Sequence, residues 1–385
     1  MTAKSPRLCP KWRAIHHYTG LILGIVFAII GLTGSILVYY LEIDEWLNAA
    51  KSVSSTDKTY ASYQSIWDAI QASEPNRQHA WRLEIPETPE QTITARYYKP
   101  AESTHQSFAP LMLSINPYTS EIISKRLWGH YLLTWIYDLH YTLLLDATGK
   151  LVMAIVGLLL AVVLMTGVYL WWPSLSKIVS ALSVKKTRNP QRLIYDLHKI
   201  SGIYPFIILQ IVTFTGIALE IPQYINPLIH YISPLEEQNT KPLSTLNSQN
   251  HPITIDQAVT IAERLFPNAK LCWIETPDGE LGTYRINLRQ SFEPNRRFPK
   301  TNIWIDQYSG EVLQMNDPAH QSAGNTLLNW LHPLHNGEAF GSIGRGLVFV
   351  SGFACPILFV TGILRSHHKK QAKRLKQTRS LSAPN

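Results

Sequence analysis

The sequence predicts a membrane protein: a four-helix transmembrane bundle built from two repeats, with two α+β domains outside the membrane. Three observations favour this fold class. Four apolar runs approach the roughly 20 residues that a helix needs to cross a bilayer. Charged residues make up only 16% of the 385-residue chain, where about a quarter is typical of soluble domains. Lysine and arginine gather beside the apolar runs, so the net charge of +8 is not spread evenly.

The four spans divide the chain into eleven predicted segments. Aromatic residues such as Trp171 and Trp172 lie near span ends, as interfacial aromatics do. In chain order, the segments are a basic N-terminus (1–17), the first span (18–41), an outside domain (42–126), an interfacial helix and turn (127–148), the second span (149–172), a basic loop (173–199), the third span (200–221), a second outside domain (222–326), an interfacial segment (327–342), the fourth span (343–364) and a basic tail (365–385).

Charge predicts the orientation of these spans. The N-terminus, the loop at 173–199 and the tail from Arg365 are rich in lysine and arginine and nearly free of acid. Such segments remain in the cytoplasm, so both termini are expected inside and both long connections outside. The first apolar run is too long for the core of a cleaved signal peptide, which spans about 7–15 residues. The three cysteines, Cys9, Cys272 and Cys355, form no metal-binding or disulfide pattern.

Each outside connection predicts one helix packed on a small antiparallel sheet. In the second, TIDQAVTIAERLF has helical periodicity, and LCWIET, TYRINLRQ and TNIWIDQYSGEVLQM alternate and turn as strands do. In the first, SYQSIWDAIQAS is helical, and HAWRLEIP, TITARYYKP and PLMLSINPYTSEIIS are strand-like. Neither connection contains a nucleotide-binding loop or a catalytic triad pattern.

The chain repeats itself, and the repeat marks four histidines. Aligning His16 with His198 places a Thr-Gly pair ending at Gly34 and at Gly216, each glycine 18 residues after its histidine. Aligning His140 with His335 places a tryptophan five residues before each histidine and a Thr-Gly pair ending 27 residues after it, at Gly167 and Gly362. Internal repeats are familiar in membrane proteins. The chain is therefore predicted to be two copies of span, outside domain and span.

The repeat places two histidines near each membrane face. His16 and His198 lie at the inner ends of two spans, and His140 and His335 lie just outside the other two. Ionisable groups beside spans are costly and usually functional. Two imidazoles facing each other across a bundle are an axial pair for haem iron, and nearby glycines would admit a bulky planar ring. His17 and His332 are alternative ligands at the same places. Zinc, with help from Asp138, Asp146 or Asp196, is the rival metal.

Several stretches resemble a known family. IDQAVTIAERLFPNAK followed by WIDQYSGEVL is similar to a PepSY domain, and WRAIHHYTGL, DLHYTLLLDATG, DLHKISG and LHPLHNGEAFG resemble the PepSY-associated transmembrane family. That family includes iron-regulated inner-membrane proteins and di-haem ferric-siderophore reductases of bacteria. The resemblance implies PepSY-like outside domains, a bacterial inner-membrane location and two b-type haems. Their ligands would be His16, His140, His198 and His335.

The predicted function is electron transfer across the membrane by a haem-dependent oxidoreductase. An inner haem would take an electron from a cytoplasmic or membrane donor, and an outer haem would pass it to a ferric siderophore or another periplasmic acceptor. One outside stretch is rich in arginine and contains Arg285, Arg289, Arg296 and Arg297. It is either a binding site for an anionic chelate or simply a solvated basic surface. Two alternatives remain open, a PepSY-based binding or regulatory module anchored by the spans and an iron-chelate permease. The lipid bilayer is an expected partner; nucleic acid is not.

Overall fold

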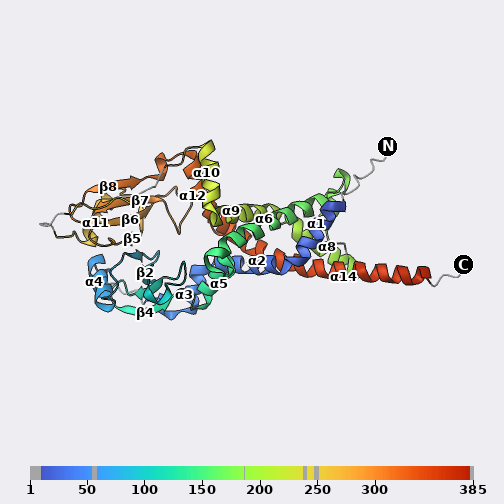
Figure 1. Cartoon of the computed structure of the whole chain (residues 1–385), viewed down its shortest axis with the longest axis horizontal. Coiled ribbons are helices and arrows are strands. Elements are labelled where there is room, and N and C mark those ends of the chain that lie inside the picture. The colour runs from blue at the N-terminus through green and yellow to red at the C-terminus, as the bar shows by residue number, and fades with distance from the viewer. Residues whose placement is uncertain (1–9, 54–58, 186, 237–240, 247–250, 382–385) are drawn as a thin grey trace.

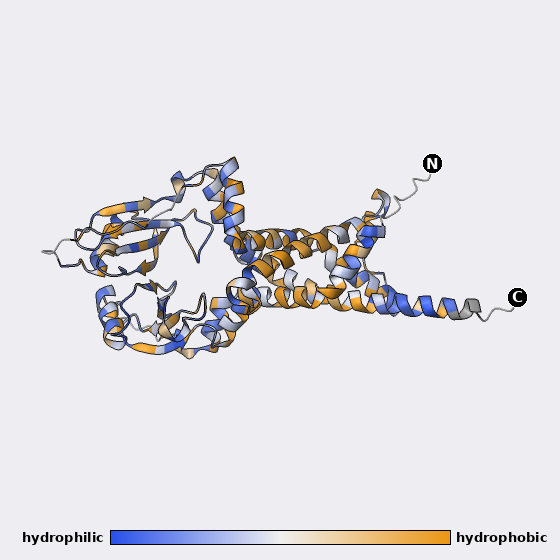
Figure 2. Ribbon diagram, in the orientation of Figure 1, coloured by the Kyte–Doolittle hydropathy of each residue, from blue (hydrophilic) through white to orange (hydrophobic). Residues whose placement is uncertain are grey.

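In the computed structural model, a bundle of long helices carries a strand-rich domain at one end (Figure 1). The structure describes residues 10–53, 59–185, 187–236, 241–246 and 251–381. The bundle helices are α1 (Pro10–Ile22), α2 (Gly24–Val38), α6 (Asp146–Trp171), α8 (Pro190–Ile203), α9 (Phe206–Glu220), α13 (Gly341–Gly352) and α14 (Ala354–Leu381). Apolar residues dominate their ribbons, and the far end of α14 is polar (Figure 2).

Two stretches are long and apolar enough to cross a membrane by themselves, α6 and the helical stretch Glu338–Leu375. Four spans result if each of two bent pairs counts as one: α1 with α2, bent by 64°, and α8 with α9, bent by 53°. The sequence predicted spans at 18–41 and 200–221 and no bend within them. In the structure both helical paths begin earlier and break midway. At the second break stands Pro205, which lacks a backbone N–H to continue the helix.

The repeated halves pack against each other in the bundle. Helix α6 of the first half lies along α9 of the second, and α2 lies along α14. Two shorter helices outside the bundle, α5 (Leu132–Thr142) and α12 (Ala323–Asn336), pack on α2 and α9 respectively. The start of α1 and the last turns of α14 are both at the end of the bundle away from the strands (Figure 1).

The strands form one continuous antiparallel sheet of eight, in the order β4-β3-β2-β1-β5-β6-β7-β8. Each half contributes four strands, and β1 of the first half pairs with β5 of the second. The two small separate sheets expected from the sequence are therefore joined at their edges. The strands are β1 (Trp81–Glu84), β2 (Ile93–Tyr97), β3 (Leu111–Ile115), β4 (Ile122–Leu127), β5 (Lys270–Glu275), β6 (Thr283–Arg289), β7 (Thr301–Asp306) and β8 (Val312–Asn316).

The two faces of this sheet differ in chemistry. One face packs on α4 (Tyr63–Ser73) and α11 (Ile255–Leu265), the two helices predicted from periodicity. That core includes Ile66, Leu83 and Ile286, each fully buried. Because strand side chains alternate between faces, the intervening residues point the other way. They are polar and aromatic: Arg82, Glu84, Thr94, Arg96, Trp273, Glu275, Arg285, Asn287, Asn302 and Trp304.

Short helices and 3-10 turns fill the connections between these longer elements. They are α3 (Tyr40–Leu47), α7 (Ile178–Ala181), α10 (Pro222–Ile232) and the 3-10 turns η1 (Ala49–Lys51), η2 (Ala101–Ser103), η3 (Leu175–Lys177), η4 (Pro318–His320) and η5 (Glu338–Phe340). Of these, α7 and η3 lie between α6 and α8 at the end of the bundle away from the sheet. Helix α12 ends at Gly337, whose φ of +85° is a conformation that favours glycine. The chain reverses there and enters α13.

Candidate functional site

The structure brings the four predicted histidines together as two pairs. His16 of α1 and His198 of α8 have ring centroids 6.3 Å apart, with ring planes at 88°. His140 of α5 and His335 of α12 have centroids 6.2 Å apart, with planes at 51°. Each pair joins one histidine from each half of the repeat. The first pair, called here the inner pair, is at the end of the bundle away from the sheet, and the second, the outer pair, is next to the sheet.

The two neighbouring histidines are placed differently. The ring of His17 packs against Tyr18, 5.2 Å away. The ring of His332 packs against Phe298, 5.0 Å away, and its Nδ1 lies 3.4 Å from the side-chain nitrogen of Asn336. Neither ring forms a facing pair with a second histidine in the described part of the chain. The geometry therefore favours His16 and His335 over these neighbours.

One hydrogen-bond pattern recurs at all four rings. Nδ1 of each lies within 3.3 Å of the hydroxyl of a threonine on a helix of the same half: His16 with Thr166, His140 with Thr33, His198 with Thr361 and His335 with Thr215. Three of the rings also lie near the backbone carbonyl three residues before that threonine: His16 with Val163 at 3.0 Å, His140 with Ile30 at 3.1 Å and His335 with Val212 at 2.8 Å. Polar partners of this kind orient imidazole ligands.

These bonds determine which ring nitrogen carries the proton. A carbonyl oxygen only accepts, so Nδ1 must donate to it. Each threonine hydroxyl donates to carbonyls of its own helix, as Thr361 does to Ile357 at 2.6 Å, and so its oxygen accepts from the ring. Nε2 is therefore left without a proton. In the described part of the chain, none of the hydrogen bonds involves Nε2 of these four histidines. All four present a lone pair suited to a metal ion.

The glycine after each threonine makes room for the ring. A Cβ added to Gly34 would lie 2.9 Å from Cε1 of His140, and one added to Gly216 would lie 2.9 Å from Cε1 of His335. The same distance is 3.2 Å from Gly167 to His16 and 3.6 Å from Gly362 to His198. The sequence predicted that these glycines admit a planar cofactor. Their closest contacts in the structure are instead with the histidine rings.

The spacing of each pair fits one metal ion between two imidazoles. With a metal–nitrogen distance of about 2.0 Å and a ring radius of about 1.1 Å, from bonds of about 1.33 Å, two imidazoles on opposite sides of one metal ion have centroids about 6.2 Å apart. The observed separations are 6.3 and 6.2 Å. Among the described residues, no group of three or more His, Cys, Asp or Glu side chains is arranged to hold a metal.

The carboxylates considered as zinc ligands have other partners. Asp138 accepts from the Trp128 indole at 2.8 Å, and Asp146 accepts from the backbone N–H of Ser107 at 3.0 Å. Asp196 pairs with Lys199 at 3.0 Å. A structural zinc site needs four protein ligands, and each pair supplies two. The arrangement suits a metal whose other ligands come from a non-protein group.

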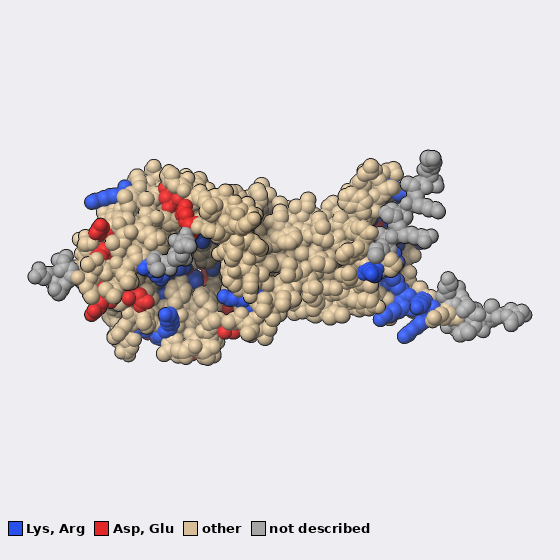
Figure 3. Space-filling view, turned by 45° about the horizontal axis from the view of Figure 1, so that its top comes forward, with Lys and Arg blue, Asp and Glu red and all other residues tan. Residues whose placement is uncertain are grey.

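Basic side chains surround the inner pair. Arg365 of α14 is close enough to interact electrostatically with both rings, and Lys369 interacts with His198. Arg13 of α1 is close to Lys369. The end of the bundle away from the sheet is accordingly rich in Lys and Arg (Figure 3).

The four predicted arginines separate into two groups. Arg285 on β6 lies between Trp273 and Trp304, 4.6 and 5.1 Å from their rings, and binds Glu275 at 3.4 Å. The other three line a pocket of about 280 Å³ between the sheet and the outer end of the bundle, and they are Arg289, Arg296 and Arg297. Helices α2 and α3, strands β1 and β5 and the segment that joins α12 to α13 supply most of the remaining walls of this pocket.

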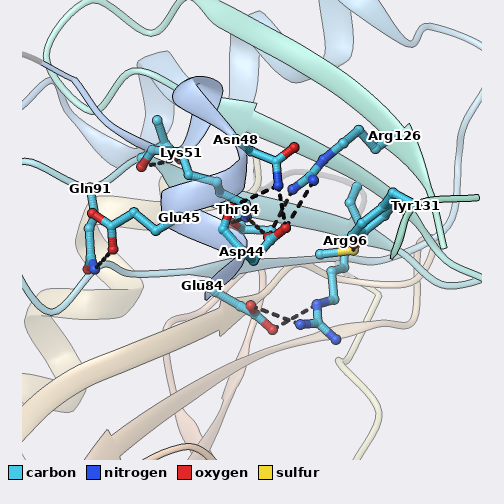
Figure 4. A network of polar contacts seen from close by, with 12 residues as sticks. Asp44, Glu45, Asn48, Lys51, Glu84, Gln91, Thr94, Arg96, Arg126 and Tyr131 are labelled. Atoms are coloured by element: carbon cyan, nitrogen blue, oxygen red, sulfur yellow. Dashed lines mark hydrogen bonds and ion pairs between the residues drawn. The ribbon is translucent and has the colours of Figure 1, made fainter. Parts of the chain in front are cut away.

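A charged network extends from this pocket along the sheet (Figure 4). Asp44 pairs with Arg126 at 3.1 Å, and Glu84 pairs with Arg96 at 2.8 Å. Burial lowers the pKa of Lys51 to about 8. Burial alone would raise the pKa of Glu84, but nearby cations, chiefly Arg96 and then Arg82, hold it below its usual range.

The chain matches a family model described as the PepSY-associated TM region over residues 13–367. That span covers nearly the whole sequence, both halves of the repeat and all four paired histidines. The chain belongs to the PepSY-associated TM family. As a member of that family with apolar helices of membrane length, it is a membrane protein. A search of curated proteins found no match.

Proposed function

We propose that this PepSY-associated TM protein transfers electrons across a bacterial inner membrane through two b-type haems and reduces a ferric chelate outside. One observation supports the proposal most: each histidine pair holds two imidazole rings at the centroid separation of a shared metal ion, and in the described structure the hydrogen bonds of all four rings involve Nδ1 and leave Nε2 free. The porphyrin of a haem supplies four ligands in a plane, so the protein needs to add only two. Bound haem supplies a one-electron redox centre.

The residues that would hold each haem follow from the pairs. His16 and His198 would be the axial ligands of the inner haem, and His140 and His335 those of the outer haem. Thr166, Thr361, Thr33 and Thr215 would keep these rings in the ligand tautomer. Arg13, Arg365 and Lys369 would offer cations to the propionate carboxylates of the inner haem.

Charge supports a cytoplasmic inner end. The start of α1 and the last turns of α14 are both at the basic end of the bundle, and the sheet is at the other end. By the positive-inside rule, both termini are cytoplasmic and the PepSY-like halves are periplasmic. Each bent helix pair would then act as one span of a four-span bundle.

The positions of the two pairs suit transfer across the bilayer. Thr215, whose hydroxyl lies near Nδ1 of His335, comes 17 positions after His198 along α8 and α9. At 1.5 Å per residue this path is at most about 25 Å, close to the roughly 30 Å of a bilayer core. The donor would be a quinol or a cytoplasmic reductant. For each electron that the donor loses, one Fe(III) becomes Fe(II), which hard oxygen chelators bind weakly.

Reconstituted vesicles provide the test. Protein would be inserted into liposomes that enclose a reductant, with a ferric chelate and an Fe(II)-specific dye outside. The proposal predicts Fe(II) outside only in vesicles that contain haem-loaded protein, with at least a tenfold loss for His140→Ala. The variant Trp46→Phe, at an exposed residue of α3, is the matched control. Equal Fe(II) release from empty vesicles, or no loss in the histidine variant, would contradict the proposal.

A further inference from the structure

The sheet face that looks away from α4 and α11 carries an excess of buried positive charge. Five basic side chains are paired there with three acidic ones, and each of the eight is less than a third exposed. The bases are Lys51, Arg82, Arg96, Arg126 and Arg285, and the acids are Asp44, Glu84 and Glu275. Buried charge is costly unless it is paired. An anion beside this face would be stabilised.

The same face presents hydrogen-bond donors without partners. The indole nitrogens of Trp273 and Trp304 are buried, and in the described structure neither donates to an acceptor. Both residues are 6% exposed, and their rings flank the guanidinium of Arg285. Native proteins leave few buried donors unsatisfied. Trp273 also lines the pocket, so a ligand whose oxygen reached its indole N–H would give that donor a partner.

Two arginines that line the pocket, Arg296 and Arg297, form no ion pair with a carboxylate in the described residues, although Arg297 interacts electrostatically with Glu84. Arg289 and Arg345 have partners, Glu87 at 4.0 Å and Glu42 at 2.5 Å. The guanidinium of Arg297 rests 4.6 Å from the ring of Tyr40, and in the described residues no carboxylate forms an ion pair with it. Figure 3 shows basic atoms inside the hollow between the sheet and the bundle.

We propose that this pocket binds a small polycarboxylate anion of about the size of citrate, free or complexed with iron. Guanidinium groups bind carboxylates through paired hydrogen bonds, and here they come from separate elements around the pocket. An anion with carboxylates several bonds apart reaches more of them than a compact ion such as phosphate. The volume of about 280 Å³ is at the lower limit of ligand pockets, which span about 300–1,000 Å³. This limits the ligand to a small one.

The pocket lies next to the outer histidine pair. Asn336, which lines it, follows His335 in sequence, and Val38, also in its wall, is on the same helix as Thr33. The idea that the bound anion carries the iron to be reduced rests on the proposed function. The binding of the anion itself does not rest on it, because the arginines and indoles are independent of any haem.

The test is calorimetric titration of the full-length protein in detergent with citrate, ferric citrate and inorganic phosphate. We expect citrate to bind at least tenfold more tightly than phosphate, and binding to weaken as salt is added. Arg297→Gln is expected to weaken citrate binding at least tenfold. Trp273→Phe, which keeps an aromatic ring but removes the indole N–H together with its five-membered ring, is expected to weaken it about threefold to tenfold. Arg264→Gln, an exposed arginine on α11, is the matched control.

Thermal unfolding of each variant separates lost binding from lost folding, and Arg345→Gln gives a second probe if Arg297→Gln is unstable. Unchanged citrate affinity in these folded variants, or no citrate binding at millimolar concentration, would overturn the inference. His335→Ala should lose the outer haem and still bind citrate. A colourless protein that binds citrate would refute the proposed function and support the citrate pocket. A di-haem protein that does not bind citrate would support the haem sites of the proposed function and refute the citrate pocket.

Discussion

Nδ1 of His140 lies 3.0 Å from the hydroxyl oxygen of Thr33, a residue 107 positions earlier in the chain. The threonine hydroxyl donates to carbonyls of its own helix, at 2.8 and 3.1 Å, and its oxygen therefore accepts from the ring. The equivalent contact in the second half joins His335 to Thr215. Two helices of each half thus cooperate in presenting one imidazole.

The threonine contacts predict a first set of variants. Thr33→Val and Thr215→Val remove one acceptor of the Nδ1 proton and keep the shape of the side chain. Loss of such an outer contact lowers metal affinity about 10–100-fold, so the outer haem should titrate away at lower concentrations of a haem-scavenging protein. Thr260→Val, at an exposed position on α11, is the control. An unchanged haem affinity in both variants would show that the threonines do not support the ligands.

The glycines predict a graded series. Alanine at residue 34 or 216 would place its Cβ 2.9 Å from the nearest atom of a paired histidine ring. The corresponding distance is 3.2 Å for alanine at residue 167 and 3.6 Å, an ordinary contact, for alanine at residue 362. Haem per chain should therefore fall most for Gly34→Ala and Gly216→Ala and least for Gly362→Ala. Alanine favours helix by up to about 1 kcal/mol, so weaker helix formation does not explain a loss. Gly346→Ala, with open space around it, is the control, and an order unrelated to these distances would count against the account.

Glu84 predicts a pH-dependent stability effect. Its carboxylate pairs with buried Arg96, and removing one partner of a buried pair costs about 3–5 kcal/mol, so Glu84→Gln should lower the free energy of unfolding by about that amount at pH 7. The folded-state pKa of Glu84 is depressed. Its contribution is therefore present above the unfolded value of 4.5 and is lost as pH falls through the folded value.

The difference in stability between the variant and the wild type should thus narrow as pH falls below 4.5 and through the depressed folded value, as followed by thermal unfolding at several pH values. Glu311→Gln, at an exposed position after β7, should change little at any pH. A gap between Glu84→Gln and wild type that is the same at pH 4 and pH 7 would show that the carboxylate charge is not the cause.

The pairing of the histidines could be predicted from the sequence because the repeat gives each one an equivalent in the other half. His16 aligns with His198 and His140 with His335, and these are the rings that the structure brings together. The helices α4 and α11 and all eight strands also follow from periodicity and turn residues. Local patterns of this kind are visible in a single stretch of chain.

Other features depend on contacts between distant segments. The joining of the halves through β1 and β5 is a pairing that no local pattern encodes. The bends within the first and third spans were missed because hydropathy records apolar length and not direction. The Thr-Gly pairs were visible in the sequence, but the role of each threonine was not, since its histidine lies on a different helix.

The central claim, that each histidine pair holds a haem, is tested most directly by a reduced-minus-oxidised optical spectrum of the purified protein with haem quantified per chain. The account predicts two b-type haems in the wild type and one in each single variant. His16→Ala and His198→Ala should lose the inner haem, and His140→Ala and His335→Ala the outer one. A colourless protein, expressed with haem available, or full haem content in all four variants, would contradict the account.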